Sequence, residues 1–197
     1  MMLNKWDAVW DLHEDQCPCD VQFVEFLETQ RISGASIFHF GTGRHHYVGI
    51  QNAENGSNNS VLGITCSRGE YNAYMDLAID QPRISRSYKA IFGDIYILDD
   101  RLLPSFDVVT LFHLCEFRTE KNSAYFAMTD LEVARLLVGK LRSGGWVLFY
   151  TGSQTFDATR PVITDLEESG LIERAGTYKT LLLYRKASGT ESDAAMP

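Results

Sequence analysis

The sequence predicts an α/β fold built on a mostly parallel sheet with helices on both faces, and three observations lead to it. Short apolar runs alternate along the chain with segments of helical periodicity. The run at residues 106–114 is almost wholly apolar, as a strand covered on both faces must be. The first run ends in Gly41-Thr42-Gly43, and only glycine lets a main chain lie flat against a ligand at such a turn.

Length and composition predict a single globular domain. The chain has 197 residues, of which 45 % are hydrophobic and 22 % charged, and residues 1–186 are expected to form one domain that begins with a helical segment over 4–33. Residues 187–197 are small and polar and are expected to be disordered. The net charge of −8 argues against nucleic acid as a partner, and no apolar run is long enough for a signal peptide or a membrane span. We expect a cytoplasmic protein with reduced cysteines.

Two helical stretches are expected before the first strand. Trp6 and Trp10 lie on one face of a helix predicted over residues 5–12. Asp20 is placed to cap a second helix, which ends near Gly34. The first stretch either forms a lid over the substrate or packs as a helix on the domain.

The first strand–helix units follow in order. Residues 35–40 are predicted to form a strand, 43–55 a helix and 61–66 a second strand. Ser67 and Glu70 then fit a capping box, in which the serine and glutamate side chains reciprocally satisfy free N–H groups at the start of the next helix.

Three more strands are expected, at residues 88–92, 106–114 and 146–151. Apolar residues at helical spacing predict a helix over 131–141, and Pro161 suits the first turn of another. Short segments at 171–174 and 181–184 flank Gly176-Thr177 and predict a terminal antiparallel hairpin. The sheet then has seven strands.

The ends of these strands predict a binding site. Parallel sheets bind ligands beyond the carboxyl ends of their strands, where the strand order reverses. In this chain the corresponding residues are Gly41–Gly43, Thr65–Ser67, Gly93-Asp94 and His113–Glu116. We expect them to lie along one rim.

Several of these motifs, in this order, resemble the class I S-adenosylmethionine-dependent methyltransferases. Phe38-His39-Phe40-Gly41-Thr42-Gly43 is similar to the family's nucleotide loop, and Phe92-Gly93-Asp94 to the turn whose acid contacts the adenine. Residues 106–113 look like the family's fourth strand, 141–148 like the run before its fifth, and the terminal hairpin is a further family mark. The resemblance covers residues 32–186 and implies a doubly wound Rossmann-like methyltransferase fold.

The resemblance implies an enzyme that uses S-adenosylmethionine to methylate a small or medium-sized acceptor, and it is compatible with a homodimer. It assigns cofactor binding to His39, Gly41, Thr42, Gly43, Thr65, Cys66, Gly93, Asp94, Phe112 and His113. His113, at the end of the fourth strand, is the candidate catalytic base for the acceptor's proton, with Glu116 as its positioning residue. Alternatively, His113 only shapes the pocket.

Three positions depart from the family pattern. His39 stands where the family has an acid, His45 replaces its third glycine, and Thr65 replaces the acid that holds the ribose, with Ser67 and Glu70 nearby as alternatives. Loss of the ribose acid is expected to weaken cofactor binding roughly ten- to a hundredfold, since a charged hydrogen bond contributes about 1.5–3 kcal/mol. His39 either bonds the cofactor's ammonium group through a neutral ring nitrogen or is a buried core histidine.

These departures favour a second hypothesis, a methyltransferase-like fold that no longer transfers methyl groups and serves as a binding or partner module. A nicotinamide dehydrogenase is disfavoured, because its third glycine would fall at His46 and its ribose acid is absent. Cys17-Pro18-Cys19 has the wrong spacing for a redox pair or a zinc knuckle. With His13 it would at most form a weak metal site, so no metal is predicted.

Overall fold

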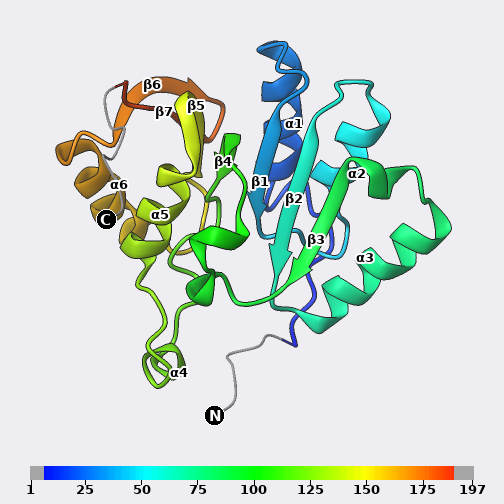
Figure 1. Ribbon diagram of the computed structural model, residues 1–197, viewed down its shortest axis with the longest axis horizontal. Coiled ribbons are helices and arrows are strands. Elements are labelled where there is room, and N and C mark those ends of the chain that lie inside the picture. The colour runs from blue at the N-terminus through cyan, green and yellow to red at the C-terminus, as the bar shows by residue number, and fades with distance from the viewer. Residues whose placement is uncertain (1–6, 189–197) are drawn as a thin grey trace.

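The computed structural model describes residues 7–188, and a seven-stranded sheet of order β3-β2-β1-β4-β5-β7-β6 forms its centre (Figure 1). The strands are β1 Ser36–Phe40, β2 Ser60–Thr65, β3 Tyr88–Phe92, β4 Phe106–Thr110, β5 Leu141–Tyr150, β6 Ile172–Tyr178 and β7 Leu181–Lys186. Strands β1 to β5 pair in parallel, whereas β7 pairs antiparallel with β5 and β6. The predicted mostly parallel sheet with a terminal hairpin is confirmed.

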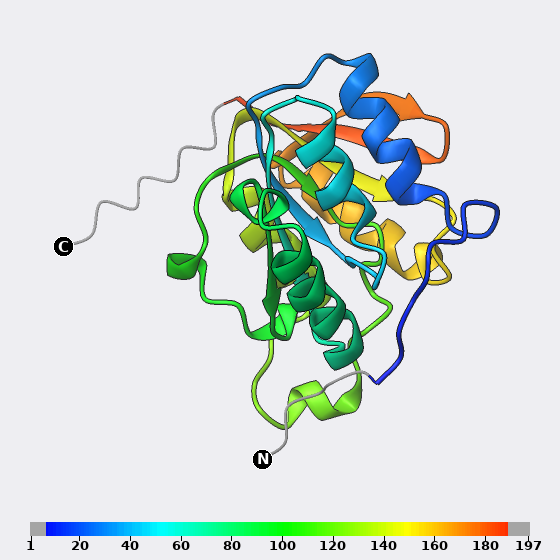
Figure 2. The same ribbon diagram turned by 90° about the vertical axis from the view of Figure 1, so that its right-hand side faces the viewer.

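Helices cover both faces of the sheet, as predicted (Figures 1 and 2). One face carries α1 Cys19–Thr29, α2 Tyr47–Glu54 and α3 Arg68–Asp80, and the other carries α5 Asp130–Gly139 and α6 Phe156–Glu168. A single turn, α4 Glu120–Ser123, lies in the connection from β4 to α5. Within residues 7–188, no helix combines the length and the apolar character that a membrane crossing needs.

Neighbouring residues of the central strands divide between two cores, because successive side chains of a strand point to opposite faces. One core packs against α1 and α2 and includes Ile37, Val108 and Leu148. The other packs against α5 and α6 and includes Phe38, Val109 and Phe149. This double burial explains why the strands are apolar at nearly every position.

The strand order reverses between β1 and β4, since β2 and β3 lie on one side of β1 and β4 on the other. The connections from these two strands therefore diverge and leave a crevice at their carboxyl ends. The fold thus places the crevice beside the glycine turn that follows β1.

The N-terminal segment differs from the prediction. Residues 7–18, which we call the strap, contain no helix, although a helix was expected over 5–12; residues 5 and 6 lie outside the described part of the chain. Helix α1 begins at Cys19 with Pro18 at its N-cap position. Asp20 therefore lies in the first turn and does not cap the helix, and its side chain is buried.

Other boundaries differ as well: α2 begins later than predicted, β4 ends earlier and β5 begins earlier. Helix α6 begins at Phe156, so Pro161 lies inside it and not in its first turn. The hairpin turns at Lys179-Thr180, between β6 and β7. Gly176, where the turn was predicted, instead lies at an irregularity of β6 at which the register with β7 shifts. Residues 189–197 of the predicted disordered tail lie outside the described residues.

Candidate functional site

A cavity of about 420 Å³ lies at the carboxyl ends of β1 to β4, where the rim was predicted. Its volume falls within the range of about 300–1,000 Å³ that is usual for small-molecule sites. The predicted site residues in its wall are Gly41, Gly43, Thr65, Cys66, Gly93, Asp94, His113 and Glu116. A larger depression of about 1040 Å³ beside α5 is an open trough that contains none of these residues.

Three predicted cofactor residues are not in the cavity wall. His39 is 2 % exposed, and its Nδ1 lies 2.8 Å from Thr110 Oγ1. Phe112 packs edge-on against the His39 ring, and the Thr42 methyl group packs against Gly63. The geometry of His39 matches the second interpretation, a buried core histidine.

The turn at residues 41–43 needs glycine at two positions, because imidazole rings pack against it. Gly41 and Gly43 have φ values of +89° and +53°, which side chains with a Cβ rarely adopt. A Cβ on Gly41 would lie 3.0 Å from the His113 ring, and one on Gly43 would overlap the His45 ring. His45 therefore lies over the turn and forms part of the cavity wall.

Asp94 is held by hydrogen bonds within the protein. Its Oδ1 accepts from the Tyr96 N–H at 2.9 Å, and its Oδ2 accepts from Asn122 Nδ2 at 3.1 Å and from the Tyr125 hydroxyl at 2.7 Å. The carboxylate thus ties the α4 region to the rim. Asp94 lies in the cavity wall, and its contact with an adenine stays a prediction.

Glu70 brings a carboxylate to the end of β2, where Thr65 itself has none. Thr65 Oγ1 donates to Glu70 Oε2 at 2.6 Å, and the Trp10 N–H donates to Oε1 at 3.3 Å. Ser67 Oγ accepts from the Glu70 N–H, so only half of the predicted capping box forms. Burial raises the pKa of Glu70 even though these hydrogen bonds oppose the shift. The Glu70 side chain therefore faces the cavity and does not cap the N-terminus of α3.

Asp20 brings a second carboxylate, from the first turn of α1 to the other side of the glycine turn. Its Oδ1 lies 3.6 Å from His39 Nε2, and its Oδ2 lies 3.9 Å from His45 Nε2. Burial acts to raise the pKa of Asp20, but the two histidines outweigh it and lower the pKa. Sequence reasoning missed this role because an acid at a helix start was taken for a cap.

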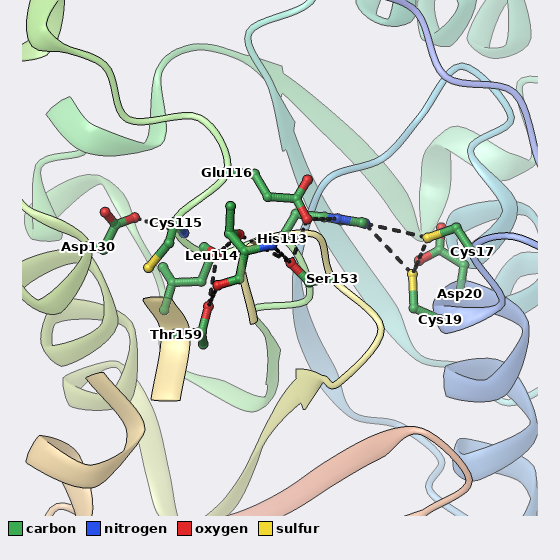
Figure 3. A network of polar contacts seen from close by, with 11 residues as sticks. Cys17, Cys19, Asp20, His113, Leu114, Cys115, Glu116, Asp130, Ser153 and Thr159 are labelled. Carbon is green, nitrogen blue, oxygen red and sulfur yellow. Dashed lines mark hydrogen bonds and ion pairs between the residues drawn. The ribbon is translucent and has the colours of Figure 1, made fainter. Parts of the chain in front are cut away.

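His113 lies between Glu116 and two cysteines (Figure 3). Its Nδ1 is 3.1 Å from Glu116 Oε1, which also accepts from Ser153 Oγ at 2.6 Å. Its Nε2 is 4.0 Å from Cys17 Sγ and 3.8 Å from Cys19 Sγ. Burial lowers the pKa of His113, but the Cys17 sulfur and the Glu116 carboxylate raise it to about 10.

The strap forms part of the cavity wall and is held by hydrogen bonds to its main chain. Ser67 Oγ donates to the Ala8 carbonyl at 2.6 Å, and the Arg44 N–H donates to the Trp10 carbonyl at 2.9 Å. Trp10, His13 and other strap residues line the cavity. The predicted helix is absent from the strap, and a lid over the substrate stays a prediction; Trp6 lies outside the described residues.

No family model matches the sequence, and neither does any curated protein. Solved structures do match. Precorrin-6y C5,15-methyltransferase from Geobacter metallireducens is 13 % identical with a TM-score of 0.61, and the match covers 92 % of this chain and 94 % of that one. Coclaurine N-methyltransferase, bound to N-methylheliamine and S-adenosylhomocysteine, is 13 % identical with a TM-score of 0.50 and coverage of 74 % and 40 %. The chain has the class I S-adenosylmethionine-dependent methyltransferase fold.

The methyltransferase fold does not by itself establish the reaction. The [4+2]-cyclase SpnF is also similar, with 16 % identity, a TM-score of 0.50 and coverage of 73 % of this chain and 49 % of that one. The chain spans less than half the length of the cyclase and of the coclaurine enzyme. The function must therefore be argued from the site.

The cavity of this methyltransferase fold is acidic. None of the described residues that line it is a lysine or an arginine. Apolar side chains form another part of the wall, namely Phe40, Ile64, Ile95 and Phe117. Five carboxylate residues line it, namely Asp11, Asp20, Glu70, Asp94 and Glu116. The cavity therefore complements a ligand that is both positively charged and partly apolar.

Proposed function

We propose that this protein binds S-adenosylmethionine and transfers its methyl group to a small or medium-sized acceptor. The observation that carries the proposal is the acidic lining of the cavity. S-adenosylmethionine has a sulfonium and an ammonium group, which outnumber its one carboxylate, and its adenine is flat and largely apolar. The phosphates of a nicotinamide dinucleotide would instead face five carboxylate residues, with no lysine or arginine in the described wall.

Glu70 is the proposed ligand of the ribose hydroxyls. Each of its carboxylate oxygens accepts one protein hydrogen bond, from Thr65 or from Trp10. A carboxylate oxygen has two lone-pair sites, so both oxygens of Glu70 retain one for a hydroxyl. Thr65, predicted to bind the cofactor, then acts by orienting Glu70.

Asp20 is the proposed partner of the methionine ammonium. A carboxylate buried away from water needs a positive partner, and the imidazoles of His39 and His45 carry a full charge only when protonated. An ammonium group supplies a permanent one. Asp20 and Glu70 then take the places of the two acids that the family pattern has at His39 and Thr65.

The other end of the cavity, with His113, Glu116, Tyr150 and Ser153, is the proposed acceptor end. The bound cofactor supplies the electrophilic methyl group, and these residues position the acceptor and limit water. Removal of the acceptor's proton by His113 requires a free Nε2 lone pair, but that atom faces two sulfur atoms. We therefore propose that His113 shapes the acceptor end, the alternative that the sequence left open.

Calorimetric titration with S-adenosylhomocysteine tests the proposal. Wild-type protein is expected to bind, and Glu70→Gln to bind roughly ten- to a hundredfold more weakly, because a charged hydrogen bond contributes about 1.5–3 kcal/mol. Glu168→Gln, an exposed change at the end of α6, is the matched control and is expected to bind like wild type. No binding by wild type at millimolar ligand would contradict the proposal and favour a non-catalytic partner module.

A further inference from the structure

Two thiols and an imidazole meet at the acceptor end of the cavity (Figure 3). Cys17 lies near the end of the strap, Cys19 begins α1, and His113 follows β4. Their ligand atoms all lie within 4.8 Å of one another, and the group is the candidate metal cluster that the described residues contain. His13, which the sequence offered as a third ligand, is not a member.

The spacing of the three atoms fits a zinc ion. The two sulfurs are 3.5 Å apart, and they lie 4.0 and 3.8 Å from His113 Nε2. Tetrahedral zinc, with bonds of about 2.3 Å to sulfur and about 2.0–2.1 Å to nitrogen, sets the corresponding edges at about 3.8 Å and about 3.6 Å. Each observed edge is within about half an ångström of these values. An ion therefore fits among the three atoms with only small side-chain shifts.

Glu116 orients His113 as a metal ligand. Its Oε1 faces His113 Nδ1 at 3.1 Å and is itself held by Ser153 at 2.6 Å. A proton on Nδ1 shared with the carboxylate leaves the lone pair on Nε2, the atom that faces the sulfurs. In protein zinc sites, the ligating histidine commonly donates its other ring N–H to a carboxylate, which fixes the orientation of the ring.

We propose that Cys17, Cys19 and His113 bind one zinc ion with its fourth coordination position open to the cavity. Three protein ligands are typical of zinc sites that keep a position for an exogenous ligand, whereas structural sites usually have four. All three residues line the cavity, so that position is accessible to a bound molecule. Metal binding does not depend on the proposed methyl transfer, but at this place the ion would coordinate the acceptor.

The cluster has two other states that the test must separate from a metal site. Without metal, the 4.0 Å contact between Cys17 Sγ and His113 Nε2 would also suit a thiolate–imidazolium pair. Cys17 and Cys19 are free cysteines with sulfurs 3.5 Å apart, so oxidation to a disulfide is the other state to exclude. The experiment therefore uses full-length protein that has been reduced and freed of metal.

Cobalt(II) is the probe, because its spectrum reports both thiolate ligation and geometry. Wild type is expected to bind one Co²⁺ per chain with thiolate-to-metal charge-transfer absorption and the strong visible bands of a tetrahedral site. Zn²⁺ should displace it, and 2-mercaptoethanol should shift the bands by occupying the open position. Cys17→Ser, Cys19→Ser and His113→Gln should each weaken binding at least about tenfold. Cys66 also lines the cavity but is not a member of the cluster, so Cys66→Ser should leave cobalt binding unchanged.

The proposal is overturned if reduced wild type shows no tetrahedral cobalt spectrum, or if the spectrum survives in both cysteine variants. Bands that 2-mercaptoethanol does not shift would refute the open position. The wild-type result does not depend on whether a variant folds, and circular dichroism identifies any variant that does not. S-adenosylhomocysteine binding, measured separately on metal-free and loaded protein, distinguishes failure of the metal site from failure of the proposed function.

Discussion

At the scale of single residues, two of the carboxylates of the cavity come from helices and not from strand ends. Asp20 belongs to α1 and Glu70 to α3, yet both line the wall near the strands that lack an acid. Thr65 remains in the site as a donor to Glu70. Substitutions in a strand-end motif therefore do not show that a cavity has lost its charge.

His46 makes stability depend on pH. Its ring is 2 % exposed, with Nδ1 2.7 Å from the Tyr88 hydroxyl and Nε2 2.9 Å from the Glu70 carbonyl. Burial lowers its pKa from 6.5 to about 4. Between these values the unfolded chain binds a proton that the folded protein does not. The contribution of neutral His46 to the free energy of unfolding is therefore complete above pH 6.5 and is lost as the pH falls to 4.

Urea unfolding of wild type and His46→Gln across this pH range measures the effect. At about 1.4 kcal/mol per pKa unit, the wild-type free energy of unfolding should fall by up to about 3 kcal/mol more than that of the variant between pH 6.5 and 4. Parallel curves for the two proteins would contradict the assignment.

At the scale of elements, the strap is the segment expected to respond to ligand. It is held at Ala8 and Trp10 by hydrogen bonds to its main chain, and it lines the cavity without a helix or strand of its own. A ligand that contacts strap side chains reduces local opening, because opening then breaks protein–ligand contacts as well.

Hydrogen exchange tests this response. S-adenosylhomocysteine should slow amide exchange in residues 8–17 several-fold while leaving the hairpin β6–β7 unchanged. Equal protection of the strap and the hairpin would indicate a global effect, and no protection of the strap would place the ligand elsewhere.

Strands were predictable from the sequence, whereas the irregular segments were not. Runs such as residues 35–40 are apolar because both faces are covered, and this signal is local. Trp10 has helical spacing but is 57 % exposed and is held by partners from distant segments. Pro161 was expected in a first turn, but α6 begins earlier. Contacts with distant segments determine the conformation of the strap and the start of α6, and a local sequence pattern carries no information about such contacts.

At the scale of the whole molecule, stability comes from two cores on opposite faces of the sheet. Phe149 belongs to the core beneath α5 and α6 and is fully buried, whereas Phe126 is 98 % exposed. Phe149→Ala should lower the free energy of unfolding by about 3–5 kcal/mol, through lost burial and the cavity that remains. Phe126→Ala should change it by less than about 0.5 kcal/mol. Chemical denaturation compares the two, and equal losses would contradict this assignment of the core.

The candidate site was predictable only where topology fixes it. The rim at Gly41, Thr65, Gly93 and His113 follows from the shared edge at which parallel strands end. The cluster of two cysteines with His113 does not, because its members are up to 96 positions apart in the chain. Contacts across such separations depend on how the strap and α1 pack, which composition and spacing do not determine.

A crystal structure with S-adenosylhomocysteine is the most direct measurement of whether this cavity is a cofactor site. The ligand is expected in the cavity beneath the strap, with its ribose hydroxyls on the Glu70 carboxylate and its ammonium facing Asp20. Ligand bound at another place, or a ribose that makes no contact with Glu70, would contradict the proposed cofactor site.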